Sequence, residues 1–80
     1  MKRIRIKAEG GVQGVGFRPF VYRIAGELSL TGWIRNTPAG VTIEVQGSEE
    51  TLEVFVSKLK SQLPAAAFLN SLSLETVPPR

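Results

Sequence analysis

This chain of 80 residues contains no cysteine, no histidine and no aspartate. Without cysteine it has no disulfide bond, no thiol nucleophile and no thiolate metal site. Without histidine it lacks the commonest metal ligand and the commonest general base. A Ser-His-Asp triad and a phosphohistidine intermediate are therefore excluded. The seven acidic residues are all glutamates, and no loop carries a pair of them, so we expect no metal site.

Long hydrophobic runs are absent as well. No stretch approaches the ~18 consecutive apolar residues of a membrane helix, and no secretory signal is visible. We therefore expect no membrane partner and a cytoplasmic location. A chain this short makes one small domain, and its 42% hydrophobic residues suffice for a single core.

The net charge of +3 suits an anionic ligand. Three of the basic side chains, Arg3, Arg5 and Lys7, are expected on the solvent side of the first strand. Only one strand carries them, so the pattern favours a solvated sheet face over a nucleic-acid patch. We expect no nucleic-acid partner.

Hydrophobic periodicity predicts six elements in the order βαββαβ. Pro19 suits the first helical position, and Ser48 can cap the second helix. This order is typical of an α+β, ferredoxin-like sandwich: a four-stranded antiparallel sheet in the order 4-1-3-2, with two helices on one face. The strands are expected at residues 2–9, 31–36, 41–46 and around 72–74, and the helices at 19–28 and 49–63.

The loop between the first strand and the first helix carries two glycines and an arginine. Gly14 and Gly16 tolerate positive φ and let a ligand approach the main chain closely. Free amides at a helix N-terminus favour anions, and the guanidinium of Arg18 adds a two-pronged donor for phosphate. The loop is therefore predicted to cradle a phosphate. The spacing does not fit a dinucleotide fingerprint, because position 19 is proline, and no Walker lysine follows.

Asn36 closes the second strand at the same edge of the predicted sheet. Since the first two strands run parallel with one strand between them, their backbones lie about 10 Å apart, and both side chains can reach one ligand. A carboxamide cannot act as a base, but it can orient a water. Hydrolysis would then rest on positioning and charge neutralisation. That suits an acyl phosphate, whose leaving group needs little protonation.

Each of these residues also has a structural interpretation, with Arg18 as a surface cation and Asn36 as a turn residue. A structural or ligand-sensing ferredoxin-like domain is therefore an alternative. An RNA-recognition domain shares the element order, but it stacks bases on aromatic residues of its central strands. The first and third strands here carry none on the open face.

Two segments resemble the acylphosphatase signature: residues 12–18 (VQGVGFR), and residues 32–36 (GWIRN) with Gly40. The resemblance runs from about residue 4 to residue 77. It implies that Arg18 binds the phosphate of an acyl phosphate, that Asn36 positions the attacking water, and that no metal takes part. It assigns the phosphate-binding amides to Gln13, Gly14, Val15, Gly16, Phe17 and Arg18.

Finer features, residues 18–23 (RPFVYR) and 36–41 (NTPAGV), look like the N-terminal domain of the hydrogenase maturation carbamoyltransferases, the HypF family. This implies a domain over residues 1–77, with residues 78–80 as a linker or the end of a cut-out piece. It also implies hydrolysis of carbamoyl phosphate to carbamate and phosphate, in a parent enzyme that uses ATP and zinc.

In that family the carbamoyl group passes to a HypE-type partner on the way to the cyanide ligands of nickel–iron hydrogenases. The domain itself is expected to need no cofactor and to bind an acyl phosphate or inorganic phosphate. A free-standing acylphosphatase and a non-catalytic phosphate-binding module remain alternatives.

Overall fold

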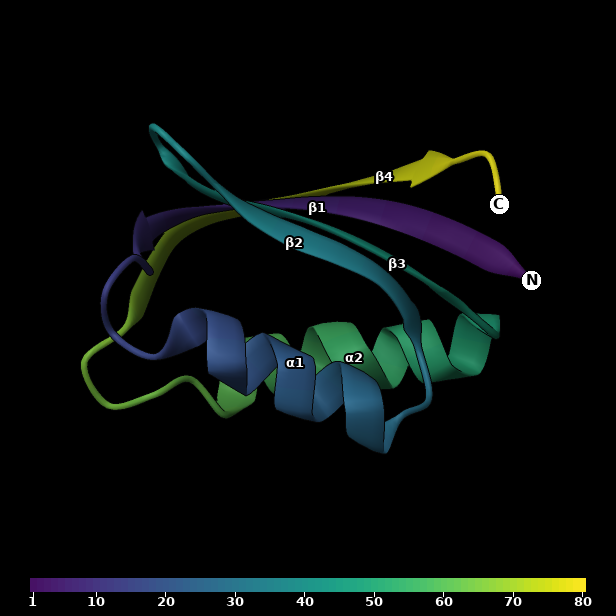
Figure 1. Cartoon of the computed structure of the whole chain (residues 1–80), viewed down its shortest axis with the longest axis horizontal. Coiled ribbons are helices and arrows are strands. Elements are labelled where there is room, and N and C mark those ends of the chain that lie inside the picture. The colour runs from purple at the N-terminus through teal and green to yellow at the C-terminus, as the bar shows by residue number, and fades with distance from the viewer.

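Four strands form one antiparallel sheet, and two helices cover one of its faces (Figure 1). This is a computed structural model that describes residues 1–80. The sheet order is β2-β3-β1-β4, which is the predicted 4-1-3-2 order read from the other edge. The predicted ferredoxin-like fold is confirmed. The elements are β1 (Lys2–Gly11), α1 (Phe17–Glu27), β2 (Thr31–Thr37), β3 (Gly40–Gly47), α2 (Glu49–Ser61) and β4 (Phe68–Val77).

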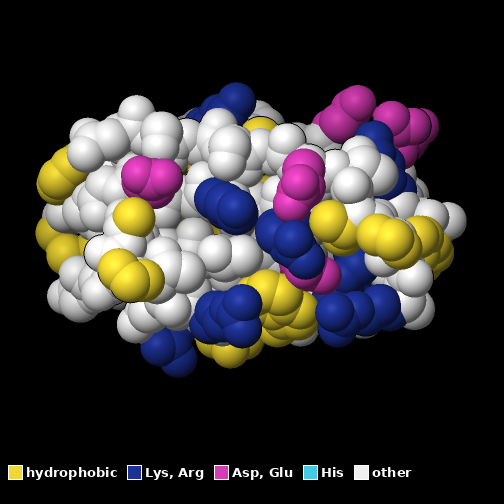
Figure 2. All heavy atoms as spheres, turned by 90° about the horizontal axis from the view of Figure 1, so that it is seen from above, with side chains coloured by type: hydrophobic (Ala, Val, Ile, Leu, Met, Phe, Trp, Pro, Cys, Tyr) yellow, Lys and Arg dark blue, Asp and Glu magenta, His cyan; other side chains and the backbone are white.

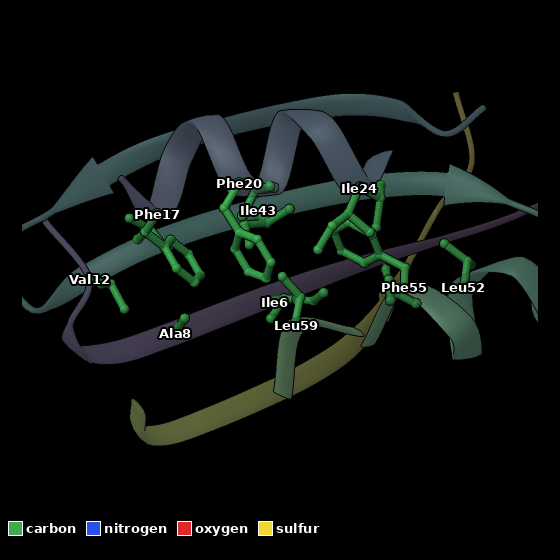
Figure 3. Packing of buried hydrophobic residues seen from close by; sticks show 14 residues of the cluster. Ile6, Ala8, Val12, Phe17, Phe20, Ile24, Ile43, Leu52, Phe55 and Leu59 are labelled. Carbon is green, nitrogen blue, oxygen red and sulfur yellow. The ribbon is translucent and has the colours of Figure 1, made fainter. Parts of the chain in front are cut away.

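The core lies between the sheet and the helices, where apolar residues of alternating strand positions meet one stripe of each helix (Figure 3). Ile6 of β1 and Ile43 of β3 pair directly and are almost fully buried. Phe55 and Leu59 of α2 are fully buried. Phe20 and Ile24 of α1 are buried as well, so one face of each helix lies against the core. Neither helix is long and apolar enough to cross a membrane.

Helix α1 begins at Phe17, two residues before the predicted start at Pro19. Gly16 is its N-cap, with a left-handed backbone (φ 79°) and no capping side chain. Pro19 is instead the third helical residue, where a missing N–H still costs nothing because the first-turn donors have no partner inside the helix. Helix α2 begins as predicted, since the hydroxyl of Ser48 accepts a hydrogen bond from the amide of Thr51 at 3.2 Å.

The edge of the sheet beside the predicted loop extends further than expected. β1 continues to Gly11, and β4 begins at Phe68 rather than beyond residue 70. A bulge between Glu9 and Gly10 shifts the register, so that Gly11 pairs with Phe68. The loop that precedes α1 is therefore short. The residue just before it, Gly11, is still paired in the sheet.

The expectation that Arg3 lies on a solvated face is wrong. Arg3 is only 4% exposed, because Glu44 of the neighbouring strand binds it and the chain end covers it. The main chain of Arg80 hydrogen-bonds twice with the side chain of Gln46, at 2.7 and 2.8 Å, so residues after β4 cross back over β1. Arg5 does reach the surface, where basic and acidic side chains lie side by side (Figure 2).

Candidate active site

The loop before α1 and the end of β2 border one hollow of about 360 Å³. The sequence predicted that Arg18 and Asn36 would meet at this edge of the sheet, and the structure brings both to the hollow. Of the predicted cradle residues, only Val15 does not line it. The lining residues are Val12, Gln13, Gly14, Gly16, Phe17, Arg18, Pro19, Tyr22 and Asn36.

Two glycines give the loop its shape. Gly14 (φ 71°) and Gly16 (φ 79°) both have left-handed backbones, which side chains disfavour. A Cβ atom at either position would meet nothing within 4 Å, so the backbone conformation, rather than space, requires glycine here. This conformation turns the chain from the end of β1 directly into α1.

The N-terminal end of α1 forms one wall of the hollow. The amides of Gly16, Phe17 and Arg18 precede the first intrahelical hydrogen bond, in which the amide of Phe20 donates to the carbonyl of Gly16 at 3.2 Å. No side chain caps this helix. Unpaired first-turn donors and the positive end of the helix dipole favour an anion at this place.

Arg18 is the cation of the hollow. It is exposed, and none of the four ion pairs of the structure includes it. In contrast, Arg3 and Arg5 are paired with Glu44 on the other face of the sheet. The hollow is lined by no carboxylate that could compete for the guanidinium of Arg18. This arginine is therefore free to bind a phosphate or carboxylate group.

Asn36 comes to the hollow from the edge strand. It pairs with Val41 of β3, whose side chain is buried in the core, so Asn36 lies on the face of the sheet that the helices cover. Asn36 itself is exposed. Its carboxamide can donate and accept hydrogen bonds to a ligand and to a water at once.

The side chain of Gln13 reaches from the loop to the turn between β2 and β3. Its Nε2 donates to the carbonyl of Thr37 at 2.6 Å and to the carbonyl of Gly40 at 2.8 Å. The sequence indicated only the main-chain amide of Gln13, because nothing in a local pattern shows a contact 24 residues away. The contact ties the loop to the β2–β3 hairpin.

Tyr22 and Pro19 also line the hollow, and the sequence did not single them out as site residues. Tyr22 follows Arg18 by four residues on α1, which places both on one face of the helix. That spacing could have identified it. No group of three or more histidine, cysteine, aspartate or glutamate side chains is placed to hold a metal ion.

The chain is similar in sequence to known proteins. The family model described as acylphosphatase matches residues 4–80. The carbamoyltransferase HypF2 of Cupriavidus necator is 52% identical over 73 residues, which cover 91% of this chain and 9% of that protein. An acylphosphatase of Lactobacillus johnsonii is 42% identical over 79 residues, covering 98% of this chain and 87% of that one.

The similarity extends to a solved structure. A crystal structure of full-length HypF, described as phosphate- and nucleotide-bound, superimposes with a TM-score of 0.96 at 35% identity. The match covers 99% of this chain and 10% of that one. The chain thus spans about a tenth of the length of the carbamoyltransferases that it matches.

Proposed function

The chain belongs to the acylphosphatase family, and from this premise we propose that its hollow binds and hydrolyses acyl phosphates. One observation carries the proposal: Arg18 of α1 and Asn36 of β2 line a single hollow at a helix N-terminus. A cation, unpaired amides and a carboxamide are the groups that this reaction needs when no acid, base or metal takes part.

The phosphoryl group is the part of the substrate that the loop would hold. Its negative oxygens accept hydrogen bonds from the loop amides of residues 13–18 and a two-pronged contact from the guanidinium of Arg18. Both stabilise negative charge on the phosphoryl oxygens, and the backbone of the loop is held in place by the N-terminus of α1. The anion then stands beside the end of β2, within reach of Asn36.

Asn36 would orient the attacking water. The water oxygen forms a bond to phosphorus as the bond between phosphorus and the acyl oxygen breaks. The carboxylate or carbamate leaves without a proton, and the phosphate that forms keeps both protons of the water. Because the leaving group is a weak base, the lack of an acid in the hollow is no obstacle.

We further propose carbamoyl phosphate as the substrate and a HypF-type carbamoyltransferase as the parent protein. The 52% identity to HypF2 and the TM-score of 0.96 to full-length HypF support this. Residues 1–77 would be the acylphosphatase-like domain and residues 78–80 a linker. This proposal includes four further properties of the parent protein. They are the use of ATP and zinc, a HypE-type partner, a role in hydrogenase maturation and a cytoplasmic location.

A free-standing acylphosphatase is the second candidate. It is favoured by the acylphosphatase of Lactobacillus johnsonii, which this chain covers over 87% of its length at 42% identity. A preference for carbamoyl phosphate over acetyl and benzoyl phosphate supports the first candidate. Equal turnover of all three supports the second.

The test is hydrolysis of these three compounds without added metal, by the wild type and by Arg18→Ala and Asn36→Ala. Arg23→Ala is the matched control, since Arg23 lies on the same helix but does not line the hollow, and its guanidinium lies over the ring of Phe20, 5.8 Å from the ring centre. We expect both site variants to lose activity and the control to keep it. Full activity in both site variants, or none in the wild type, refutes the proposed function.

A further inference from the structure

We propose that the side chain of Gln13 is a positioning residue, which sets the place of Asn36 relative to the phosphate loop. The inference rests on the proposed function, because it concerns the water that Asn36 orients. It assigns to Gln13 a second role, apart from the main-chain amide that the loop would direct at the phosphate.

The contacts are made with the tip of the hairpin that carries Asn36. Gln13 donates both hydrogens of its carboxamide, to the carbonyls of Thr37 and Gly40 at 2.6 and 2.8 Å. These two residues pair with each other across the β2–β3 turn, and Thr37 directly follows Asn36. One side chain thus holds both strands of the hairpin where they meet.

The hairpin has few other supports at this end. β2 is an edge strand that pairs with β3 alone. In Figure 1 the tip of the β2–β3 hairpin rises away from the layer of helices. Within the hairpin, the amide of Gly40 donates to the hydroxyl of Thr37 at 3.1 Å. That hydrogen bond lies inside the turn and does not connect it to another part of the protein. Gln13 is the side chain that bonds the turn to the phosphate loop.

A carboxamide suits this place because it has two donors on one atom. A carboxylate of the same length would direct its oxygens at two carbonyl oxygens and could donate to neither. Methionine has a similar length but no donor, so Gln13→Met removes both hydrogen bonds with little change in volume. Gln13 is exposed, so this substitution leaves the core unchanged.

Kinetic measurements can separate two functions of the loop, which are binding the phosphate and helping to place the water. Phosphate binding depends on the amides and on Arg18, which Gln13→Met leaves in place. Placing the water depends on Asn36, and a displacement of about 1 Å can lower a rate by about 100-fold. We therefore expect Gln13→Met to lower kcat about 10- to 100-fold, with KM and the inhibition constant of inorganic phosphate within about twofold.

Gln46→Met is the matched control. The carboxamide of Gln46 also binds a main chain, that of Arg80, but at the other end of β3. Acyl-phosphate turnover is measured for the wild type, both glutamine variants, Asn36→Ala and the double variant of Gln13 and Asn36. If Gln13 acts through Asn36, Gln13→Met lowers kcat in the wild type and changes nothing further in Asn36→Ala.

Three results overturn the inference: full kcat in Gln13→Met, a raised KM with unchanged kcat, or a further loss in the Asn36→Ala background. Asn36→Ala with full activity refutes the proposed function instead. Nitrogen-15 relaxation of the amides of residues 36, 37, 39 and 40 gives a readout that needs no turnover. Gln13→Met should increase the motion of these amides and Gln46→Met should not, so unchanged order in both overturns the inference.

Discussion

Arg3 donates from Nε to Oε1 of Glu44 at 2.6 Å, and both side chains are almost fully buried on the sheet face that carries no helix. Arg5 binds the other carboxylate oxygen of Glu44 from its Nη2 at 2.8 Å. The hydrogen bonds from Arg3 and then Arg5 lower the pKa of the Glu44 carboxyl, and Glu44 raises the pKa of Arg5. One carboxylate therefore satisfies two cations of a central strand.

The lowered pKa of Glu44 predicts acid sensitivity. The folded state holds this carboxyl ionised below its unfolded pKa of about 4.3. Its contribution to stability is therefore complete above that pKa and is lost as the pH falls through the lower folded pKa. Urea unfolding between about pH 7 and pH 3 should show a steeper loss of stability in the wild type than in Glu44→Gln. Parallel pH profiles for the two proteins would contradict this.

Substitutions of Glu44 and of Arg3 should differ in how much they lower the stability of the protein. Glu44→Leu leaves Arg3 buried without a counterion, which is strongly unfavourable. Arg3→Met leaves Glu44 paired with Arg5 and places an apolar side chain in a covered site. We expect Glu44→Leu to lower the urea midpoint more than Arg3→Met does, with equal slopes of free energy against urea. The reverse order would show that Arg5 alone cannot hold the carboxylate.

Leu59 tests the core face of α2. It is fully buried among the side chains of the sheet and the helices, so Leu59→Ala should lower the free energy of unfolding by roughly 2–4 kcal/mol. Val54 lies on the outer side of the same helix and is 43% exposed. Val54→Ala should change stability by less than about 0.5 kcal/mol. Similar effects of the two substitutions in urea unfolding would be inconsistent with this packing.

Inorganic phosphate should stabilise the fold by mass action. A ligand at 100 times its dissociation constant adds about 2.7 kcal/mol. Thermal unfolding of the wild type and of Arg23→Ala should therefore shift upward in millimolar phosphate, at an ionic strength matched with chloride. Arg18→Ala should not respond. A phosphate response in Arg18→Ala equal to the wild type would remove this arginine from the site.

Two glycines of the same region should respond to alanine in opposite directions. At Gly16 the left-handed backbone makes Gly16→Ala unfavourable by about 1–2 kcal/mol. Gly26 lies inside α1 with no positive φ, and a Cβ there meets nothing within 4 Å. Gly26→Ala should therefore stabilise the protein by about 0.5–1 kcal/mol. Chemical unfolding of the two variants decides this, and stabilisation by Gly16→Ala would show that the cap is not left-handed.

The sequence sufficed for the features that depend on local patterns. Alternation and helical spacing gave the six elements, and the handedness of crossovers gave the sheet order. The parallel directions of β1 and β2 brought Arg18 and Asn36 to one edge. All of these follow from rules that act over a few residues or on whole elements.

Other features depend on contacts between distant segments and could not be predicted in this way. Helix α1 begins earlier than predicted because its N-cap is a glycine with a left-handed backbone. Such a cap has no side chain by which the sequence could reveal it. Arg3 is buried by Glu44 and by the returning chain end, neither of which is visible in the pattern of β1. The hydrogen bonds of Gln13 likewise arise only once the hairpin lies beside the loop.

The sheet order also decides when the site can form during folding. The β2–β3 hairpin, which carries Asn36, closes over a two-residue turn and is a local structure. The strand that delivers Arg18 pairs only with remote partners: Lys2 with Gly47, and Arg3 with Val77. Such distant pairings carry the larger loss of chain entropy and slow the search for the native state. The proposed catalytic arrangement is therefore complete only once the first strand has paired with the third, so turnover requires a long-range step of folding and not the hairpin alone.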